Sequence, residues 1–287
     1  MVGDRQGDAE RRPRRASNDR TSSNNSGPRR HHDQGGRDQR RDQRGGSRGS
    51  GPNRPRPAQS ADNGEPTREG PRLPSDVEAK ELAPDVRREL VTLDKTTADF
   101  VARHLVMAGK LLDEDPEAAL AHARAARNRA GRIAVVREAV GIAAYHSGDW
   151  AQALAELRAA RRMGSKSALL PMIADCERGV GRPERALELA RSDEAAALTG
   201  EDADELRIVT AGARSDLGQF EQALAILSSP PLDPTSVGPT AARLFYVYAD
   251  TLLALGRGEE ALQWFLRAAE ADIDGITDAE DRITELS

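Results

Sequence analysis

The segment Gly148–Ala160 reads Gly-Asp-Trp-Ala-Gln-Ala-Leu-Ala-Glu-Leu-Arg-Ala-Ala and decides the fold class. An apolar stretch with helical periodicity, residues 133–146, precedes it. Glycine ends a helix readily because the left-handed backbone carries no steric penalty without a Cβ atom. The alanines and leucines after the glycine again recur at helical spacing. The segment therefore predicts the turn and second helix of a helix–turn–helix hairpin.

The Ala-Leu dipeptide of this segment recurs along the chain. The five copies start at Ala119, Ala153, Ala186, Ala223 and Ala261, with spacings of 34, 33, 37 and 38 residues. A glycine stands five positions earlier in four of them, at Gly148, Gly181, Gly218 and Gly256. Periods of 20–50 residues are typical of solenoids, in which single hairpins bury their apolar stripes against neighbouring hairpins. The spacing predicts an all-α domain of about five stacked hairpins.

These repeats resemble the tetratricopeptide repeat (TPR) family, whose helix–turn–helix unit has a small residue in helix A, a glycine turn, an aromatic residue and alanines in helix B. The matching residues are Gly141, Gly148, Trp150, Ala153, Leu157 and Ala160 in the second copy, Ala211, Gly218, Phe220, Ala223 and Leu227 in the fourth, and Ala249, Gly256, Ala261, Phe265 and Ala268 in the fifth. The third copy keeps Gly181 and Ala186 but has Pro183 in the aromatic place and Asp193 at the last small position. The resemblance implies a right-handed superhelical solenoid over residues 96–272.

Residues 1–75 have a different composition from the rest of the chain. They contain 17 Arg, no Lys, 10 acidic residues and 7 apolar residues, so their charge is +7, whereas residues 76–287 carry −12. Ordering 75 residues would cost on the order of 100 kcal/mol, far more than seven apolar residues recover by burial. We expect a disordered tail that serves as a solvated linker. RNA contact through its arginine–glycine run is the alternative, which the interleaved aspartates and the lack of aromatic residues disfavour.

The ends of the solenoid and the compartment follow from simpler signals. Residues 76–95 are expected to form an N-terminal capping segment broken at Pro84, and residues 273–287 a C-terminal capping helix that begins with a capping box at Thr277–Glu280. No apolar stretch approaches the ~18 residues of a membrane span, and the start lacks the apolar core of a secretory signal. One cysteine, Cys176, excludes an internal disulfide framework. A cytoplasmic protein is expected.

Catalytic motifs are missing from the sequence. The phosphate-binding loop, the nucleophile elbow and the zinc-protease pattern do not occur. The residues Gly256–Ala261 match Gly-x-Gly-x-x-Ala, but a helix precedes them where a dinucleotide site needs a strand. His104 and His146 are expected to face the groove and His122 to lie on a helix B, without a carboxylate or cysteine partner. We therefore expect no enzyme activity, no cofactor and no metal, and we expect Cys176 to be a buried, inert thiol.

The resemblance also implies which residues face the concave groove of the solenoid. The repeat register places there Glu138, Ile142, Tyr145, His146, Asp175, Arg178, Glu205, Ile208, Asp216, Arg243, Tyr246 and Asp250. The set mixes aromatic residues with five acids and two arginines. It lacks the Lys and Asn with which some family members hold a terminal carboxylate, so that class of ligand is not expected.

The expected function is a non-catalytic scaffold or adaptor that binds a peptide or protein segment in this groove. No small-molecule substrate and no membrane partner are expected. The alternative is an RNA- or ribosome-associated factor that contacts phosphates through its arginine–glycine arm. The opposite charges of tail and domain leave a third arrangement open, in which Arg37, Arg40, Arg41, Arg44 and Arg48 bind the chain's own groove.

Overall fold

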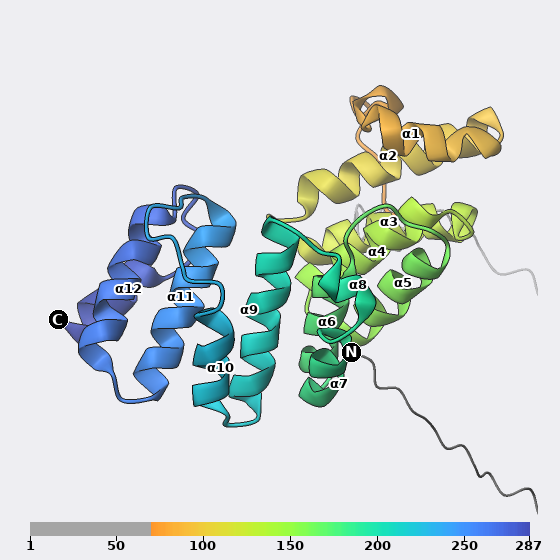
Figure 1. Ribbon diagram of the computed structural model, residues 1–287. Helices are drawn as coiled ribbons and strands as arrows, with labels where there is room; N and C mark the ends of the chain where they lie inside the picture. Colours follow the sequence, from red (N-terminus) through yellow and green to blue (C-terminus); the bar gives the residue numbers. More distant parts are fainter. Residues whose placement is uncertain (1–69) are drawn as a thin grey trace, which may run out of the picture. The chain divides into compact units, whose positions relative to one another are not determined.

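Antiparallel helical hairpins make up residues 70–287, the part of the chain that the computed structural model describes (Figure 1). All of these residues belong to one unit of the chain, Asp62–Ser287. The expected disordered tail comprises residues 1–75, of which residues 1–69, with the predicted RNA contacts and groove binding, lie outside the described residues. The described part begins at Gly70, where an added Cβ atom would lie 2.5 Å from Ala125 Cβ and 3.7 Å from His104 Cε1.

The five predicted hairpins are present. They are α2 (Lys95–Leu111) with α3 (Pro116–Ala130), α4 (Ala134–His146) with α5 (Trp150–Arg162), α6 (Leu170–Gly179) with α7 (Pro183–Leu189), α9 (Glu201–Asp216) with α10 (Phe220–Leu227), and α11 (Pro239–Ala254) with α12 (Gly258–Ala271). The two helices of each hairpin pack on each other, and each hairpin packs on the next one along the chain. The prediction of an all-α solenoid is confirmed for residues 70–287.

One turn geometry recurs in four hairpins. The turn glycines have φ of 76° at Gly148, 76° at Gly181, 70° at Gly218 and 75° at Gly256. The residue after each glycine donates its backbone N–H to the carbonyl five residues earlier; Asp149, for example, donates to Ala144 at 2.9 Å. Such bonds satisfy the last carbonyls of helix A. Because φ is positive at this place, a side chain there would strain the backbone.

The hairpin helices cross at small residues. A Cβ atom built on Gly141 would lie 2.6 Å from Leu157 Cδ2, so only glycine lets the α4 backbone come this close to α5. The alanines of the repeat pattern are fully buried at Ala153, Ala160, Ala186, Ala211, Ala223, Ala249, Ala261 and Ala268. Phe265 and Leu157 fill the space between the helices and are also fully buried. Small side chains at the crossings thus bring the helices together around a few large ones.

The third hairpin is short, as its degenerate sequence suggests. Its second helix, α7, begins at Pro183 and ends after seven residues at Leu189. Asp193, at the place of the last small residue, instead begins the four-residue helix α8 (Asp193–Ala196), whose N-cap is Ser192. Helix α9 of the next hairpin packs against both α6 and α7, and so covers the apolar surface that the short α7 leaves on this hairpin.

The N-terminal cap consists of three short helices, η1 (Ala79–Glu81), α1 (Pro84–Glu89) and η2 (Leu90–Thr92). Pro84 starts α1, since its fixed φ suits the first helical position. The cap is tied to α2 by an ion pair between Lys110 Nζ and Glu81 Oε2 at 2.6 Å. Arg103 also donates from Nε to the carbonyl oxygen of Val77 at 2.8 Å.

At the other end, α13 (Ala279–Leu286) packs on α12. The predicted capping box is wrong. The N-cap residue Asp278 makes no side-chain cap bond, and the hydroxyl of Thr277 donates to Asp272 Oδ2 at 2.6 Å. Asp272 also accepts from the backbone N–H groups of Ile276 and Thr277, so it organises this loop in place of the box.

Substituting a crossing alanine tests the packing. Ala153→Leu and Ala223→Leu are each expected to lower the free energy of unfolding by ~1–3 kcal/mol, because a larger side chain overpacks the crossing. The matched control is Ala155→Leu, since Ala155 is exposed on α5, whereas Ala159 is half-buried. Urea unfolding followed by circular dichroism measures all three. Equal losses at the buried and exposed sites would contradict the assigned crossings.

Candidate functional site

The A helices of the hairpins follow one another along the solenoid and carry the predicted groove residues. Helix α2 packs on α4, α6 on α9, and α9 on α11. Between α4 and α6 the link is a side-chain bond, in which the hydroxyl of Tyr145 donates to Asp175 Oδ2 at 2.5 Å. Burial, followed by the charge of Asp175, raises the pKa of Tyr145, so the phenol keeps its proton and remains a donor.

Arg178 joins the third and fourth repeats directly, and Asp175, which it contacts, accepts from Tyr145 of the second. The Nη1 atom of Arg178 donates to Asp175 Oδ1 at 2.7 Å, one turn away on α6. Its Nε and Nη2 donate to the two oxygens of Asp216 on α9, at 2.8 and 3.1 Å. The guanidinium group lies over Gly212, where an added Cβ would be 2.5 Å from Arg178 Cζ. The absence of a side chain at Gly212 therefore makes room for a bidentate bridge between repeats.

Two more arginines form bridges of the same kind. Arg243 of α11 contacts Glu205 of α9, and the hydroxyl of Thr240 donates to the same carboxylate at 3.0 Å. Arg282 of α13 donates to Asp250 Oδ1 at 3.3 Å. Four of the five predicted groove acids therefore have an arginine partner, and their charge is largely compensated within residues 70–287.

The fifth acid, Glu138, has hydroxyl partners. Ser165 Oγ and Ser167 Oγ, both on the loop between α5 and α6, donate to its two oxygens at 2.6 Å each. Glu138 thus fixes this loop against α4. The predicted groove residue His146 is exposed, with Nδ1 3.9 Å from Asp113 Oδ1.

Two other predicted groove residues contribute to packing. Ile208 is half-buried against the core around Leu227. The ring of Tyr246 stands edge-on to Phe265, with 5.3 Å between ring centres. Burial, followed by a hydrogen bond with Asp278, raises the pKa of Tyr246 to about 12.

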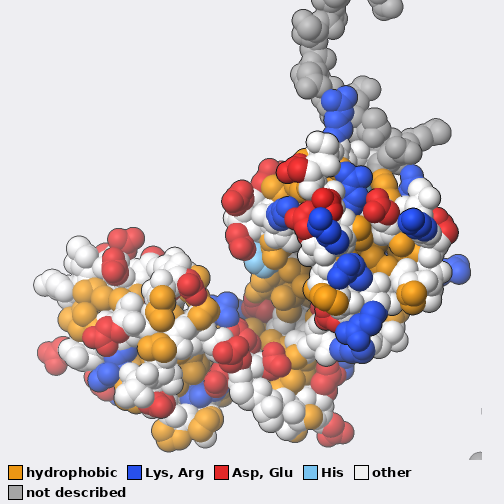
Figure 2. Space-filling view, turned by 90° about the horizontal axis from the view of Figure 1, so that it is seen from above, with side chains coloured by type: hydrophobic (Ala, Val, Ile, Leu, Met, Phe, Trp, Pro, Cys, Tyr) orange, Lys and Arg blue, Asp and Glu red, His pale blue; other side chains and the backbone are white. Residues whose placement is uncertain are grey.

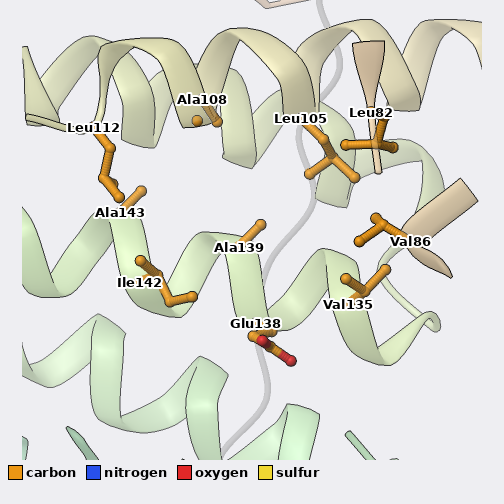
Figure 3. Close-up of a pocket in the computed structure, with 11 residues that line it drawn as sticks. Leu82, Val86, Leu105, Ala108, Leu112, Val135, Glu138, Ala139, Ile142 and Ala143 are labelled. Carbon is orange, nitrogen blue, oxygen red and sulfur yellow. The ribbon is translucent and has the colours of Figure 1, made fainter. Parts of the chain in front are cut away.

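An apolar cavity of about 200 Å³ opens between α2 and α4 (Figure 3). Its walls are Leu105, Ala108, Gly109 and Leu112 of α2, Val135, Glu138, Ala139, Ile142 and Ala143 of α4, and Leu82 and Val86 of the cap. Figure 3 shows Leu82 and Val86 at one end of the gap, and the Glu138 carboxylate turned away from it. The sequence analysis had placed Glu138 and Ile142 in the groove but missed the cap, because no repeat register extends to residues 79–92.

The expectation that His104 faces the groove is wrong. His104 and His122 are 1% and 4% exposed, and their Nδ1 atoms lie 2.9 Å apart between α2 and α3. One ring must donate and the other accept, so both are neutral or share one proton. Phe100 stacks on His104 with 4.3 Å between ring centres. Helical spacing alone did not reveal the pair, since the two residues are in different helices.

This histidine pair predicts a loss of stability in mild acid. Burial, followed by the charges of His122, Arg103 and Arg129, lowers the pKa of His104 to about 4, and burial lowers that of His122. The folded chain therefore binds fewer protons than the unfolded chain. The stability that the neutral pair contributes is complete above about pH 6.5 and is lost as the pH falls toward 4. Between pH 7.5 and pH 5 we expect a loss of roughly 2 kcal/mol from this pair.

Urea unfolding at the two pH values, for the wild type and for His104→Leu/His122→Leu, isolates this contribution. On acidification from pH 7.5 to pH 5, the free energy of unfolding of the double variant should fall by roughly 2 kcal/mol less than that of the wild type. An identical pH dependence in both proteins would show that the pair does not titrate as described.

Cys176 is fully buried, as expected. Burial, followed by the charges of Asp175 and Glu177, raises the pKa of its thiol to about 12, so it is not a nucleophile at neutral pH. Within residues 70–287, His, Cys, Asp and Glu side chains do not gather in groups of three or more that could hold a metal ion. None of the described helices is long and apolar enough to cross a membrane.

The Arg178 bridge can be compared with a simple surface pair. Arg178→Met should lower the free energy of unfolding by ~1–2 kcal/mol, because it leaves Asp175 and Asp216 without their shared cation. The matched control is Arg185→Met, which removes the exposed pair of Arg185 and Glu188 and should leave the free energy of unfolding nearly unchanged. Urea unfolding at pH 7 measures both. Comparable effects would mean that the bridge is no stronger than a surface ion pair.

Stacked hairpins, a shared turn and small residues at the crossings define an all-α solenoid of TPR-like repeats. Among solved structures the chain is similar to YrrB, described as a TPR protein with an unusual peptide-binding site, with a TM-score of 0.39 and 19% identity over 61% of this chain and 87% of that chain. The repeat assignment depends on the residues above and not on this match. No family model and no curated protein matches the sequence.

Proposed function

We propose that this protein is a non-catalytic scaffold that binds a segment of a partner protein along its A helices, with an apolar side chain of the partner in the cavity between α2 and α4. The observation that supports this most directly is the lining of the cavity, where aliphatic side chains from α2, α4 and the cap converge. Burial of an apolar side chain at such a place contributes most of the binding free energy in many peptide complexes.

The size of the cavity favours a side chain over a small molecule. Pockets for drug-sized ligands usually enclose roughly 300–1,000 Å³, whereas this cavity has about 200 Å³. One large aliphatic or aromatic side chain is therefore the better fit. The rest of the ligand would lie outside the cavity, which requires a chain that continues in both directions, as a peptide does.

The polar groups next to the cavity are suited to holding a backbone. Tyr145, Asp175 and Arg178 follow Ile142 along the same face and are bonded to one another, so their orientations are fixed before a ligand arrives. Fixed polar groups lose little conformational entropy on binding. They retain acceptor and donor capacity toward the amide groups of an extended peptide.

A charge placed in the cavity tests the proposal. Partners are captured from a cell extract with the full chain, and the affinity of the captured partner is measured by calorimetry. Ile142→Glu and Leu82→Glu should each weaken binding at least tenfold, because a carboxylate in the cavity would be desolvated by the apolar side chain. Ala155→Glu, on the exposed side of α5, should leave the affinity unchanged.

Both cavity variants must keep the helical circular dichroism signal and the melting temperature within a few degrees. Leu82 lies in the cap and outside the repeats, so a folded Leu82→Glu protein is available even if Ile142→Glu unfolds. Undiminished binding by a folded cavity variant would exclude the cavity as the anchoring site. The alternative function, RNA contact, depends on tail residues 37–48, which lie outside the described residues.

A further inference from the structure

An exposed apolar hollow with basic side chains lies on the N-terminal cap. We call it the N patch and define it by Arg87, Arg88, Val91, Leu93 and Lys95, which line the hollow together with Pro84 and the start of α2. Val91 is 80% exposed, the highest value among the large apolar residues of the described chain. A valine this exposed, beside an open hollow, is unusual for a terminal repeat, whose outer face is normally polar.

The cations of the N patch lack partners within residues 70–287. Arg87, Arg88 and Lys95 are exposed and make no ion pair or hydrogen bond through their side chains there. The neighbouring Lys80 and Lys110, in contrast, pair with Glu78 and Glu81. Asp99 is the single carboxylate among the residues that line the hollow. The residues that line the hollow therefore combine apolar surface with three cations and one carboxylate, while Asp85, Glu89 and Asp94 of the same segment lie outside the lining.

The last repeat has an apolar surface of the opposite charge. We call it the C patch and define it by Val237, Ile273 and Ile276, which are 67%, 75% and 45% exposed. The three come from two loops held side by side, because the N–H of Gly238 donates to the carbonyl of Ala271 at 3.0 Å.

Unpaired carboxylates surround the C patch. Glu270, Asp274 and Glu280 are exposed, and the described chain offers none of them a cation. Residues 270–287 contain seven acidic residues and one arginine. That arginine, Arg282, is already bonded to Asp250 and Glu285.

The N patch and the C patch of one molecule cannot contact each other. The N patch lies on the cap of the first repeat and the C patch on the last, with three hairpins between them. Figure 2 looks down on the side where α1 lies, and shows basic side chains interspersed with acidic ones over the N-terminal repeats and mainly acidic and hydrophobic ones over the C-terminal repeats. Single exposed apolar residues need no explanation. Here each group adjoins unpaired charges, and the two charges are opposite.

From this complementarity we propose that the N patch of one copy binds the C patch of a second copy of this chain. Val91 and the hollow beside it receive Ile273 and Ile276, while Arg87, Arg88 and Lys95 face Glu270, Asp274 and Glu280. The contact is heterologous, since different surfaces of the two copies meet. It leaves the cavity between α2 and α4 open, so it is independent of the proposed scaffold function.

Sedimentation velocity of the full chain, at concentrations up to about 200 µM, tests the contact. At about 50 mM salt the weight-average mass should rise with concentration above the 31.0 kDa of one chain. At about 500 mM salt the association should weaken, since the Debye length shrinks to only a few ångströms. A wild-type chain that remains monomeric at low salt overturns the proposal.

Variants with one blocked patch make the test specific. Val91→Glu puts a negative charge in the N patch, and Ile273→Lys puts a positive charge in the C patch, so each should weaken self-association at least tenfold. An equimolar mixture should regain association, because the first variant keeps its C patch and the second its N patch. Met163→Glu, at an exposed apolar residue outside both patches, should behave as wild type.

The other outcomes also decide the question. Association that persists in both single variants, or a mixture that stays monomeric, would show that the patches do not bind each other. If an unrelated acidic peptide displaces the wild-type contact no better than a neutral one, the pairing of opposite charges is overturned, and with it the proposal.

Discussion

The close approach of two helix backbones at each hairpin is the constraint on which the rest of this structure depends. Gly141 against Leu157 is one example, and the buried residues Ala174, Ala211 and Ala249 take the same place in the third, fourth and fifth hairpins. A short interaxial distance leaves room for one large side chain per crossing, such as Phe265. Most of the sequence is then free to vary. This explains how repeats with few residues in common stack into one solenoid.

Because the stacking fixes the A helices side by side, polar residues at equivalent places meet their counterparts from the next repeat. Three ion pairs between helices arise in this way, namely Arg178 with Asp216, Arg243 with Glu205, and Arg282 with Asp250. A surface that looks acidic from its residue count is largely charge-compensated once the pairs are formed. The open apolar cavity between α2 and α4, lined by aliphatic side chains, is therefore the place where we propose that a partner is anchored.

The sequence predicted what is local and repeated. The turn at Gly148 and the alanines of helix B depend on residues within one hairpin, and the structure has them where the pattern placed them. Contacts between side chains of different helices could not be predicted from the repeat pattern. His104 contacts His122 only because α2 and α3 pack on each other at these two residues. Thr277 has a capping-box pattern, yet Asp272 offers its hydroxyl a better acceptor. The cavity depends on the cap, which follows no repeat register.

The short length of α7 has a consequence for how the repeat array unfolds. In an array of repeats, cooperativity passes only from one hairpin to the next, so it is limited by the weakest link. Helix α3 buries seven residues, whereas α7 and α10, the B helices of the third and fourth hairpins, bury only two each. The weakest coupling is therefore expected in this middle part of the array. Local opening there would separate the N-terminal hairpins from the last one, so that one side could unfold while the other stayed native.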